Sequence, residues 1–168
     1  MTKQATEKII LGIDPGFADT GFGVIKKMGA ELTVLDYGSI KTPAGEEFSR
    51  RLLYIHSAVT NLIKRYRPEC VAVEELFFYK NITTAIKVSQ ARGTVLLAAA
   101  QAKTRVMEFT PLQVKQGLTG YGGAAKKQMG QMVKIVLKLD TIPKPDDAAD
   151  ALAIAVCAAS SLRVKSLL

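Results

Sequence analysis

The stretch from Ala148 to Ala159 is apolar at every position except Asp150. A helix that is apolar on all sides has to be buried, so this stretch predicts a central helix in a folded domain. Burying a carboxylate is costly unless the group is neutralised or finds a cation. No Lys or Arg lies within reach of Asp150 on the same helix, so its partner has to come from elsewhere.

Asp146 and Asp147 stand at the start of this helix. Side chains three or four residues apart share a helix face, so either aspartate could face the same side as Asp150. One of them is expected to cap the helix, because aspartate is a preferred N-cap residue. We expect the cap to be Asp146, but spacing alone does not decide which aspartate pairs with Asp150.

The rest of the chain alternates strand and helix patterns. Its 168 residues are expected to form one domain, with a basic tail that frays from about residue 161. Strands followed by alternating helices and strands predict an α/β fold with a five-stranded mixed sheet and helices on its faces. Strands are expected at 9–13, 21–25, 32–40, 70–73 and 104–109, helices at 48–65, 81–103, from 111, at 125–139 and from 146 or 147 to about 161, and a flexible loop at 117–123.

Two more carboxylates, Asp14 and Glu74, follow the two short apolar strands. The carboxyl ends of central strands are where open α/β sheets place their functional sites. Alternatively, Asp14 is a turn residue in Asp-Pro-Gly and Glu74 is a solvated charge at a strand end. If both acids meet those of the last helix, their mutual repulsion calls for hard divalent cations, and oxygen ligands suit Mg²⁺ or Mn²⁺.

Lys and Arg exceed Asp and Glu by 23 to 15, which gives a net charge of +8. This excess favours a polyanionic partner such as nucleic acid, although it could also serve solubility alone.

Cys70 and Cys157 lie far apart in apolar stretches, which favours buried thiols in a reducing, cytoplasmic setting. No run approaches the roughly 18 apolar residues that a membrane span needs, so no membrane association is expected.

Three further features have two interpretations each. The aromatic and basic segment from Phe77 to Lys80 could stack on unpaired bases or pack in the core. Arg92 could contact a backbone phosphate or anchor a loop through an ion pair. The helix at 81–103 carries two apolar stripes, one with Ile82, Ile86, Gly93, Leu97 and Ala100, so one stripe could face a partner subunit or the whole helix could be buried.

Several motifs together resemble the RuvC-type Holliday junction resolvases, a family with an RNase H-like fold. They agree in order and spacing: GIDPG with TGFGV at 12–24, VAVEELFFYKN at 71–81, QARG at 90–93, QVKQ at 113–116 and DAADALAIA at 147–155. The resemblance implies four metal ligands and thereby selects Asp147 over Asp146: Asp14, Glu74, Asp147 and Asp150. It also implies that Lys115, Lys126 and Phe77 lie near the cut phosphate.

For function, the resemblance implies an endonuclease that binds four-way DNA junctions as a homodimer and nicks two opposed strands. Two Mg²⁺ ions per subunit would act in hydrolysis, one held by Asp14 with Asp147 or Asp150 and the other by Asp14 with Glu74, leaving a 5′-phosphate and a 3′-hydroxyl. The RuvA and RuvB branch-migration proteins are implied partners. Two alternatives stay open: an ATP-binding domain of the actin and sugar-kinase type, and a junction-binding module without catalysis.

Overall fold

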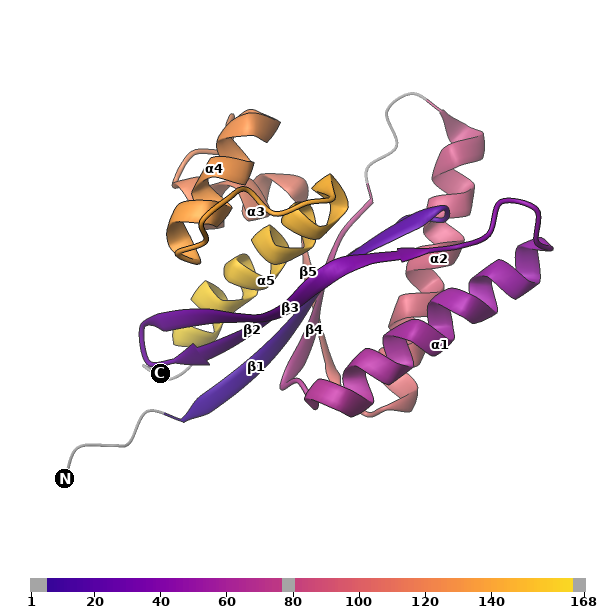
Figure 1. The fold of residues 1–168 in the computed structure, drawn as a ribbon, viewed down its shortest axis with the longest axis horizontal. Coiled ribbons are helices and arrows are strands. Elements are labelled where there is room, and N and C mark those ends of the chain that lie inside the picture. The colour runs from indigo at the N-terminus through magenta and orange to yellow at the C-terminus, as the bar shows by residue number, and fades with distance from the viewer. Residues whose placement is uncertain (1–5, 77–80, 165–168) are drawn as a thin grey trace.

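One mixed β-sheet forms the centre of the molecule (Figure 1). The structure, a computed structural model, describes residues 6–76 and 81–164. Five strands are arranged in the order β3-β2-β1-β4-β5; β1 runs antiparallel to β2 and β2 to β3, whereas β1, β4 and β5 are parallel. The strands are β1 (Glu7–Asp14), β2 (Asp19–Met28), β3 (Glu31–Lys41), β4 (Cys70–Glu74) and β5 (Arg105–Phe109).

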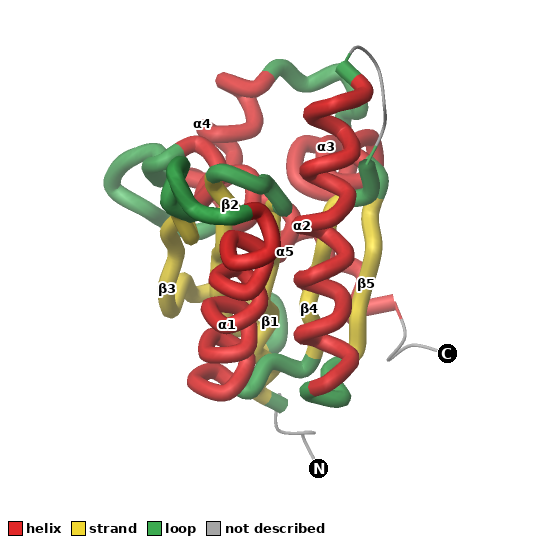
Figure 2. Tube along the Cα trace, turned by 90° about the vertical axis from the view of Figure 1, so that its right-hand side faces the viewer, coloured by secondary structure: helices red, strands yellow, loops and turns green. Residues whose placement is uncertain are grey.

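Helices cover both faces of the sheet, which confirms the predicted fold class (Figure 1). The helices α1 and α2 pack on one face, and the view from their side shows α2 close to β4 and β5 (Figure 2). The helices α3, α4 and α5 form the layer on the other face. Their bounds are α1 (Phe48–Tyr66), α2 (Ile82–Gln101), α3 (Pro111–Thr119), α4 (Lys126–Val136) and α5 (Asp146–Val164).

The helix α5 is buried through its central part, as its composition predicts. Every residue from Ala151 to Ala159 is buried. This close packing depends on glycines in the strands beneath: a Cβ atom at Gly12 would collide with the carbonyl oxygen of Ala151, and one at Gly21 with that of Asp147. Because these two glycines have no side chain, the first turns of α5 can lie directly on β1 and β2.

The boundaries of several segments differ from those expected; β2, for example, covers Asp19–Met28 where the sequence predicts a strand at 21–25. The helix α3 continues to Thr119, so three of the seven residues of the expected loop at 117–123 are helical. A capping box at Thr110 and Gln113 starts this helix, and Gly120 ends it with positive φ. The helix α4 ends at Val136, and α5 continues to Val164.

Within residues 6–76 and 81–164, no helix combines the length and the hydropathy that crossing a membrane requires.

Candidate metal and nucleic-acid site

Asp14 and Glu74 lie side by side because they end neighbouring parallel strands. In the β1–β4 pair, Ile13 is opposite Val73, so the next residue on each strand is a carboxylate. Ile13 and Val73 belong to the core on the α1 and α2 side. Since side chains alternate along a strand, Asp14 and Glu74 face the opposite side, where α5 lies.

Asp147 and Asp150 complete the site from the first two turns of α5. Asp14, Asp147 and Asp150 each offer a carboxylate oxygen, and these oxygens all lie within 4.8 Å of one another. Glu74 lines a pocket of about 230 Å³ together with Asp14 and Asp150. The site therefore consists of oxygen donors contributed by β1, β4 and α5, a donor set that suits a hard divalent cation.

Asp146 plays a different part from its neighbour, and the expectation that it caps α5 is wrong. Asp146 is already the first residue of the helix, so the N-cap position belongs to the residue before it. That residue is Pro145, whose carbonyl oxygen accepts a hydrogen bond from the amide of Ala148. Its carboxylate accepts a hydrogen bond from Lys144 Nζ at 2.7 Å and lies 3.9 Å from Lys126 Nζ. Asp147 instead belongs to the group with Asp14, as the family resemblance implies.

Two lysines stand beside the carboxylates. Lys115 of α3 and Lys126 of α4 line the same pocket as Asp14, Glu74 and Asp150. Lys126 Nζ lies 3.4 Å from Asp150 Oδ2, which supplies the cation that the sequence requires for this buried helix. A second pocket of about 290 Å³ adjoins the first and is lined by Lys126, Lys127, Lys144 and Asp150 among others.

The crowding of negative charge raises the pKa values of the acids. Burial, followed by the charges of Asp150, Glu74 and Asp147, raises the pKa of Asp14 from 3.8 to about 8. Burial is also the main cause that raises the pKa values of Glu74, Asp147 and Asp150. The pKa of Lys126 is raised mainly by Asp150. A divalent cation among these oxygens would favour their ionised forms.

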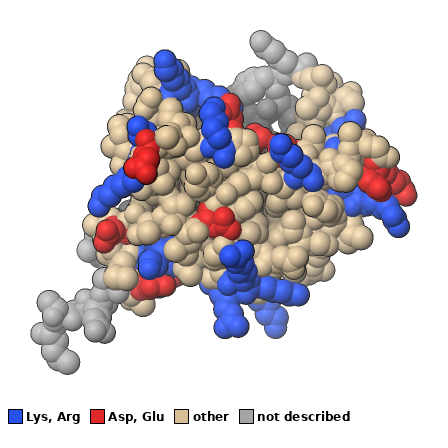
Figure 3. Space-filling model, in the orientation of Figure 1, with Lys and Arg blue, Asp and Glu red and all other residues tan. Residues whose placement is uncertain are grey.

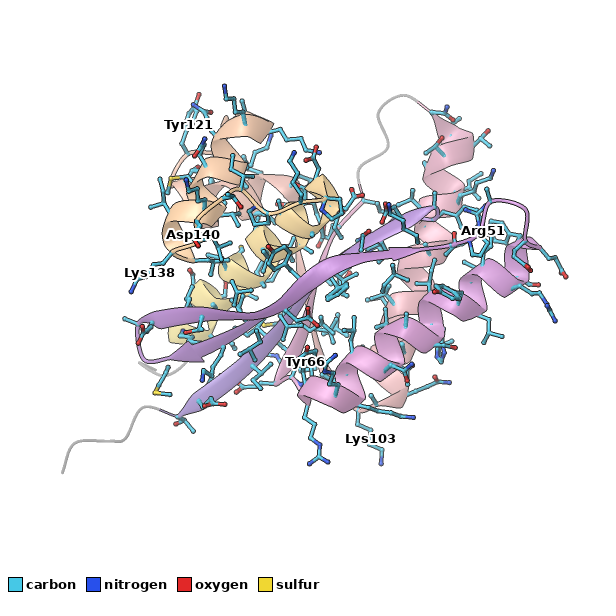
Figure 4. The ribbon with its side chains drawn as sticks, in the orientation of Figure 1. Arg51, Tyr66, Lys103, Tyr121, Lys138 and Asp140 are labelled. Carbon is cyan, nitrogen blue, oxygen red and sulfur yellow. The ribbon has the colours of Figure 1, made fainter. Side chains whose placement is uncertain are left out.

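The loop after Asp14 is fixed by contacts that the sequence did not reveal. Phe17 stacks on Phe48 with ring centroids 4.6 Å apart. The guanidinium of Arg51, a residue of α1 that is labelled in Figure 4, lies 3.9 Å from the centre of the Phe17 ring. Arg51 also donates to Thr42 Oγ1, whose hydroxyl donates to the carbonyl oxygen of Phe17. These contacts hold the end of β1 against α1 and so restrict the backbone that carries Asp14.

The remaining predicted site residues are placed differently. Arg92 forms an ion pair with Glu108 and donates from Nε to the carbonyl oxygen of Glu74 at 3.3 Å. Phe77 and Lys80 lie outside the described residues. Asp19, at the start of β2, contributes to raising the pKa of Asp147 and has a buried oxygen without a hydrogen-bond partner among the described residues.

The fold and the acidic cluster define an RNase H-like protein with a candidate divalent-metal centre. A family model described as crossover junction endodeoxyribonuclease RuvC matches residues 10–158. The chain belongs to this RuvC family. The RuvC of Ruminiclostridium cellulolyticum is 53% identical over 160 residues, covering 95% of this chain and 96% of that protein.

Solved structures agree with this membership. Thermus thermophilus RuvC is 42% identical, covers 94% of this chain and 96% of its own, and superposes with a TM-score of 0.86. The same protein in complex with a Holliday junction substrate gives 41% identity, coverage of 95% and 97%, and a TM-score of 0.89. The yeast mitochondrial Holliday junction resolvase Ydc2, 14% identical with a TM-score of 0.62, shares the fold.

Proposed function

We propose that this chain is a structure-selective endonuclease that binds four-way DNA junctions as a homodimer and nicks two opposed strands symmetrically. The observation that carries the proposal is the meeting of Asp14, Asp147 and Asp150 within 4.8 Å. The substrate is proposed from the relatives, which are described as crossover junction endodeoxyribonucleases, and from the junction complex of T. thermophilus RuvC. The products would be a 5′-phosphate and a 3′-hydroxyl.

The donor set fits two Mg²⁺ ions per subunit, with Mn²⁺ as a possible substitute. All four proposed ligands are carboxylates. Asp14 shares a pocket with Glu74 and a cluster with the α5 acids, so it could contribute to holding both ions. When bound, a pair of such ions activates a water molecule and stabilises the leaving oxygen of an in-line phosphodiester displacement. The raised pKa of Asp14, about 8, supports this role because burial first, and then the neighbouring carboxylates, disfavour its ionised form unless a cation is bound.

The lysines of the site would act on the DNA itself. Lys126 is 66% exposed, so its ammonium group can leave Asp150 and approach a phosphate. An ammonium group beside the phosphate stabilises the negative charge that develops on its oxygens during hydrolysis. Lys115 lines the same pocket and would hold a neighbouring phosphate. Basic side chains are spread over the visible face rather than gathered in one patch (Figure 3), which suits a large branched ligand.

Two further DNA contacts are proposed from the sequence. Phe77 would stack on an unpaired base near the branch point and Lys80 would contact the backbone; both follow Glu74 closely in the chain. The prediction that Arg92 contacts DNA remains untested. Its pairing with Glu108 supports the alternative, an anchoring role.

Symmetric cutting is most simply done by a two-fold dimer with one site per subunit. The outer stripe of α2 supports such a dimer. Ile82, Ile86 and Leu97 are 78%, 54% and 53% exposed, and Gly93 lies between them with open space where a Cβ would be. The second stripe, with Val95, Ala98 and Ala99, is buried against this subunit's own core. Two copies of the outer stripe would cover each other.

The wider setting is proposed from the family. RuvA and RuvB are the expected partners in recombination and repair, and the cytoplasm is the expected compartment; the two buried free thiols, Cys70 and Cys157, agree with it. We propose that residues 1–168 form one nuclease domain. An ATP-binding domain of the actin and sugar-kinase type is disfavoured because it needs two such domains and a second phosphate loop.

Cleavage of synthetic DNA tests the proposal. The protein should nick a four-way junction in Mg²⁺, leave a linear duplex of the same sequence intact, and cut neither in EDTA. Binding of the junction without any cutting in Mg²⁺ or Mn²⁺ would favour the non-catalytic module. Thermal stabilisation by ATP without junction binding would favour the kinase-type alternative.

A further inference from the structure

Arg92 lies beneath the site, on the face of the sheet opposite the carboxylates. It belongs to α2, which lies beside β4 and β5 (Figure 2). Its side chain is only 19% exposed. By contrast, Lys115 and Lys126 come from α3 and α4 and line the pocket on the other face. The position of Arg92 thus differs from that of the two lysines that would meet the phosphate.

The guanidinium of Arg92 is engaged at two points. One terminal nitrogen forms an ion pair with the carboxylate of Glu108 on β5. The Nε atom donates a hydrogen bond to the backbone carbonyl oxygen of Glu74, the last residue of β4, at 3.3 Å. Arg92 therefore connects the end of β4 to β5 through a side chain of α2.

The strand register explains how this contact reaches Glu74 without occupying the metal pocket. Glu108 is opposite Val73, and Val73 packs on the α2 side of the sheet. Glu108 therefore points toward α2, whereas the next pair, Glu74 and Phe109, points the other way. Arg92 holds the backbone of Glu74 from one face while the carboxylate of Glu74 extends from the other.

The end of β4 is paired with β5 but not with β1, since Glu74 is opposite Phe109 in the β4–β5 ladder. After Glu74, the amide of Glu75 donates to the carbonyl oxygen of Phe109 at 2.8 Å. Glu74 has no partner in the β1–β4 ladder, whose last pair is Ile13 with Val73. The charge-assisted hydrogen bond from Arg92 to its carbonyl oxygen therefore adds a second contact, besides the pairing with β5, that fixes the backbone of this residue.

We propose that Arg92, held in place by Glu108, is a positioning residue for Glu74 and makes no direct contact with DNA. The proposal rests on the metal role assigned to Glu74. Groups that orient a metal ligand from behind commonly change metal affinity or activity by 10- to 100-fold when removed. Loss of either member of the pair should loosen Glu74 and weaken metal binding even without DNA.

The test compares Arg92→Gln and Glu108→Gln with a control, Arg105→Gln, which removes an exposed arginine at the distant amino end of β5. Mn²⁺ binding is measured by titration calorimetry on the DNA-free protein. Junction affinity is measured by fluorescence anisotropy in EDTA at several salt concentrations, and cutting is measured under single-turnover conditions.

We expect Arg92→Gln and Glu108→Gln each to weaken Mn²⁺ binding and to slow cutting by about tenfold or more. Junction affinity and its salt slope should stay within about twofold of the wild type, as should every property of Arg105→Gln. The double variant should be no worse than Arg92→Gln alone, because the two residues act as one unit.

A different pattern would overturn the proposal. If Arg92→Gln lowers junction affinity and reduces the salt slope while Glu108→Gln cuts normally, Arg92 is a phosphate contact. If both variants only lower the melting temperature and bind Mn²⁺ normally, the pair serves stability alone. If the wild type itself fails to cut junctions, the proposed function is wrong, yet the Mn²⁺ comparison still decides whether Arg92 positions Glu74.

Discussion

Lys126 Nζ lies 3.4 Å from Oδ2 of Asp150, so a mobile cation from α4 neutralises the one acid within the buried part of α5. The same lysine is 66% exposed and lines the pocket that contains Asp14 and Glu74. A group in this position can compensate the carboxylate before metal and DNA bind and can turn to the phosphate afterwards.

Replacing Lys126 should slow chemistry more than it weakens binding. We expect Lys126→Gln to lower the single-turnover cutting rate by roughly 10²-fold, because a cation facing the developing charge is lost. Junction affinity in EDTA should change by less than about threefold, since one phosphate contact among many is removed. Lys127→Gln, its exposed neighbour on the same helix, is the control and should cut at nearly the wild-type rate. Equal losses in rate and in affinity would reduce Lys126 to an ordinary backbone contact.

Replacing Asp150 should separate cutting from binding still more sharply. Asp150→Asn removes a proposed metal ligand, so the cutting rate should fall by roughly 10³-fold or more. Junction affinity should be unchanged or slightly higher, because a negative charge facing the phosphate is removed. Electrophoretic mobility shifts in EDTA, alongside cleavage in Mg²⁺, measure both. Severe loss of junction binding in a folded variant would count against the scheme.

The stability of the metal-free protein should decrease as pH rises. The pKa of Asp14 is about 8 in the folded state and 3.8 without burial and like charges, so the folded state holds this proton more tightly than the unfolded state. The contribution of this proton to the free energy of unfolding is fully present below about pH 4 and is lost as pH rises toward 8. The free energy of unfolding should fall by at most about 1.4 kcal/mol per pH unit over this range. Urea denaturation in EDTA at several pH values measures the slope.

Two controls isolate the contribution of Asp14 to this slope. Asp14→Asn should flatten the dependence, because the amide does not titrate. Saturating Mg²⁺ should flatten it as well, because the cation favours the ionised carboxylate. A wild-type stability that rises between pH 5.5 and pH 8 in EDTA would contradict the crowding of acids described above.

A methyl group at Gly21 should disturb the site by displacing the backbone of α5. Its Cβ would collide with the carbonyl oxygen of Asp147, so α5 has to move away from β2. We expect Gly21→Ala to cost about 1–3 kcal/mol of unfolding free energy and to weaken Mn²⁺ binding. Gly45→Ala, where a Cβ meets nothing within 4 Å, is the matched control. Normal Mn²⁺ affinity in Gly21→Ala would show that the glycine is not needed to place Asp147.

The dimer prediction is tested on the outer stripe of α2. Leu97→Glu places a charge on the proposed interface and should shift the protein to a monomer in sedimentation velocity. The monomer should lose paired nicking of the junction. Leu53→Glu introduces the same charge at a residue of α1 that is 63% exposed, and it should leave the oligomeric state unchanged. A dimer that survives Leu97→Glu would place the interface elsewhere.

Much of the site could be predicted because it lies at strand ends and on one helix. Asp14 and Glu74 follow short apolar strands, and parallel pairing of β1 with β4 brings them together. The choice between Asp146 and Asp147 could not be made from spacing, since both share a face with Asp150. In the structure Asp146 pairs with Lys144 and Lys126, whereas Asp147 joins Asp14 and Asp150.

Other features depend on tertiary contacts that no local pattern specifies. The pair of Arg92 with Glu108 joins a helix to a strand, and nothing in the sequence around either residue names its partner. The close approach of α5 depends on Gly12 and Gly21, whose role becomes visible only when the helix is seen above them. The sequence does not locate the end of α3, because Gly117 and Gly120 both resemble helix stop signals. Of these two glycines only Gly120, just after the helix, adopts positive φ.

The central claim is that acids from β1, β4 and α5 hold divalent cations. The most direct measurement is an anomalous difference map from crystals of the protein with junction DNA, soaked in Mn²⁺. We predict two peaks about 4 Å apart, bridged by Asp14, with Glu74 at one and the α5 acids at the other. A map with no peak within coordination distance of Asp14 in a well-ordered complex would contradict the account.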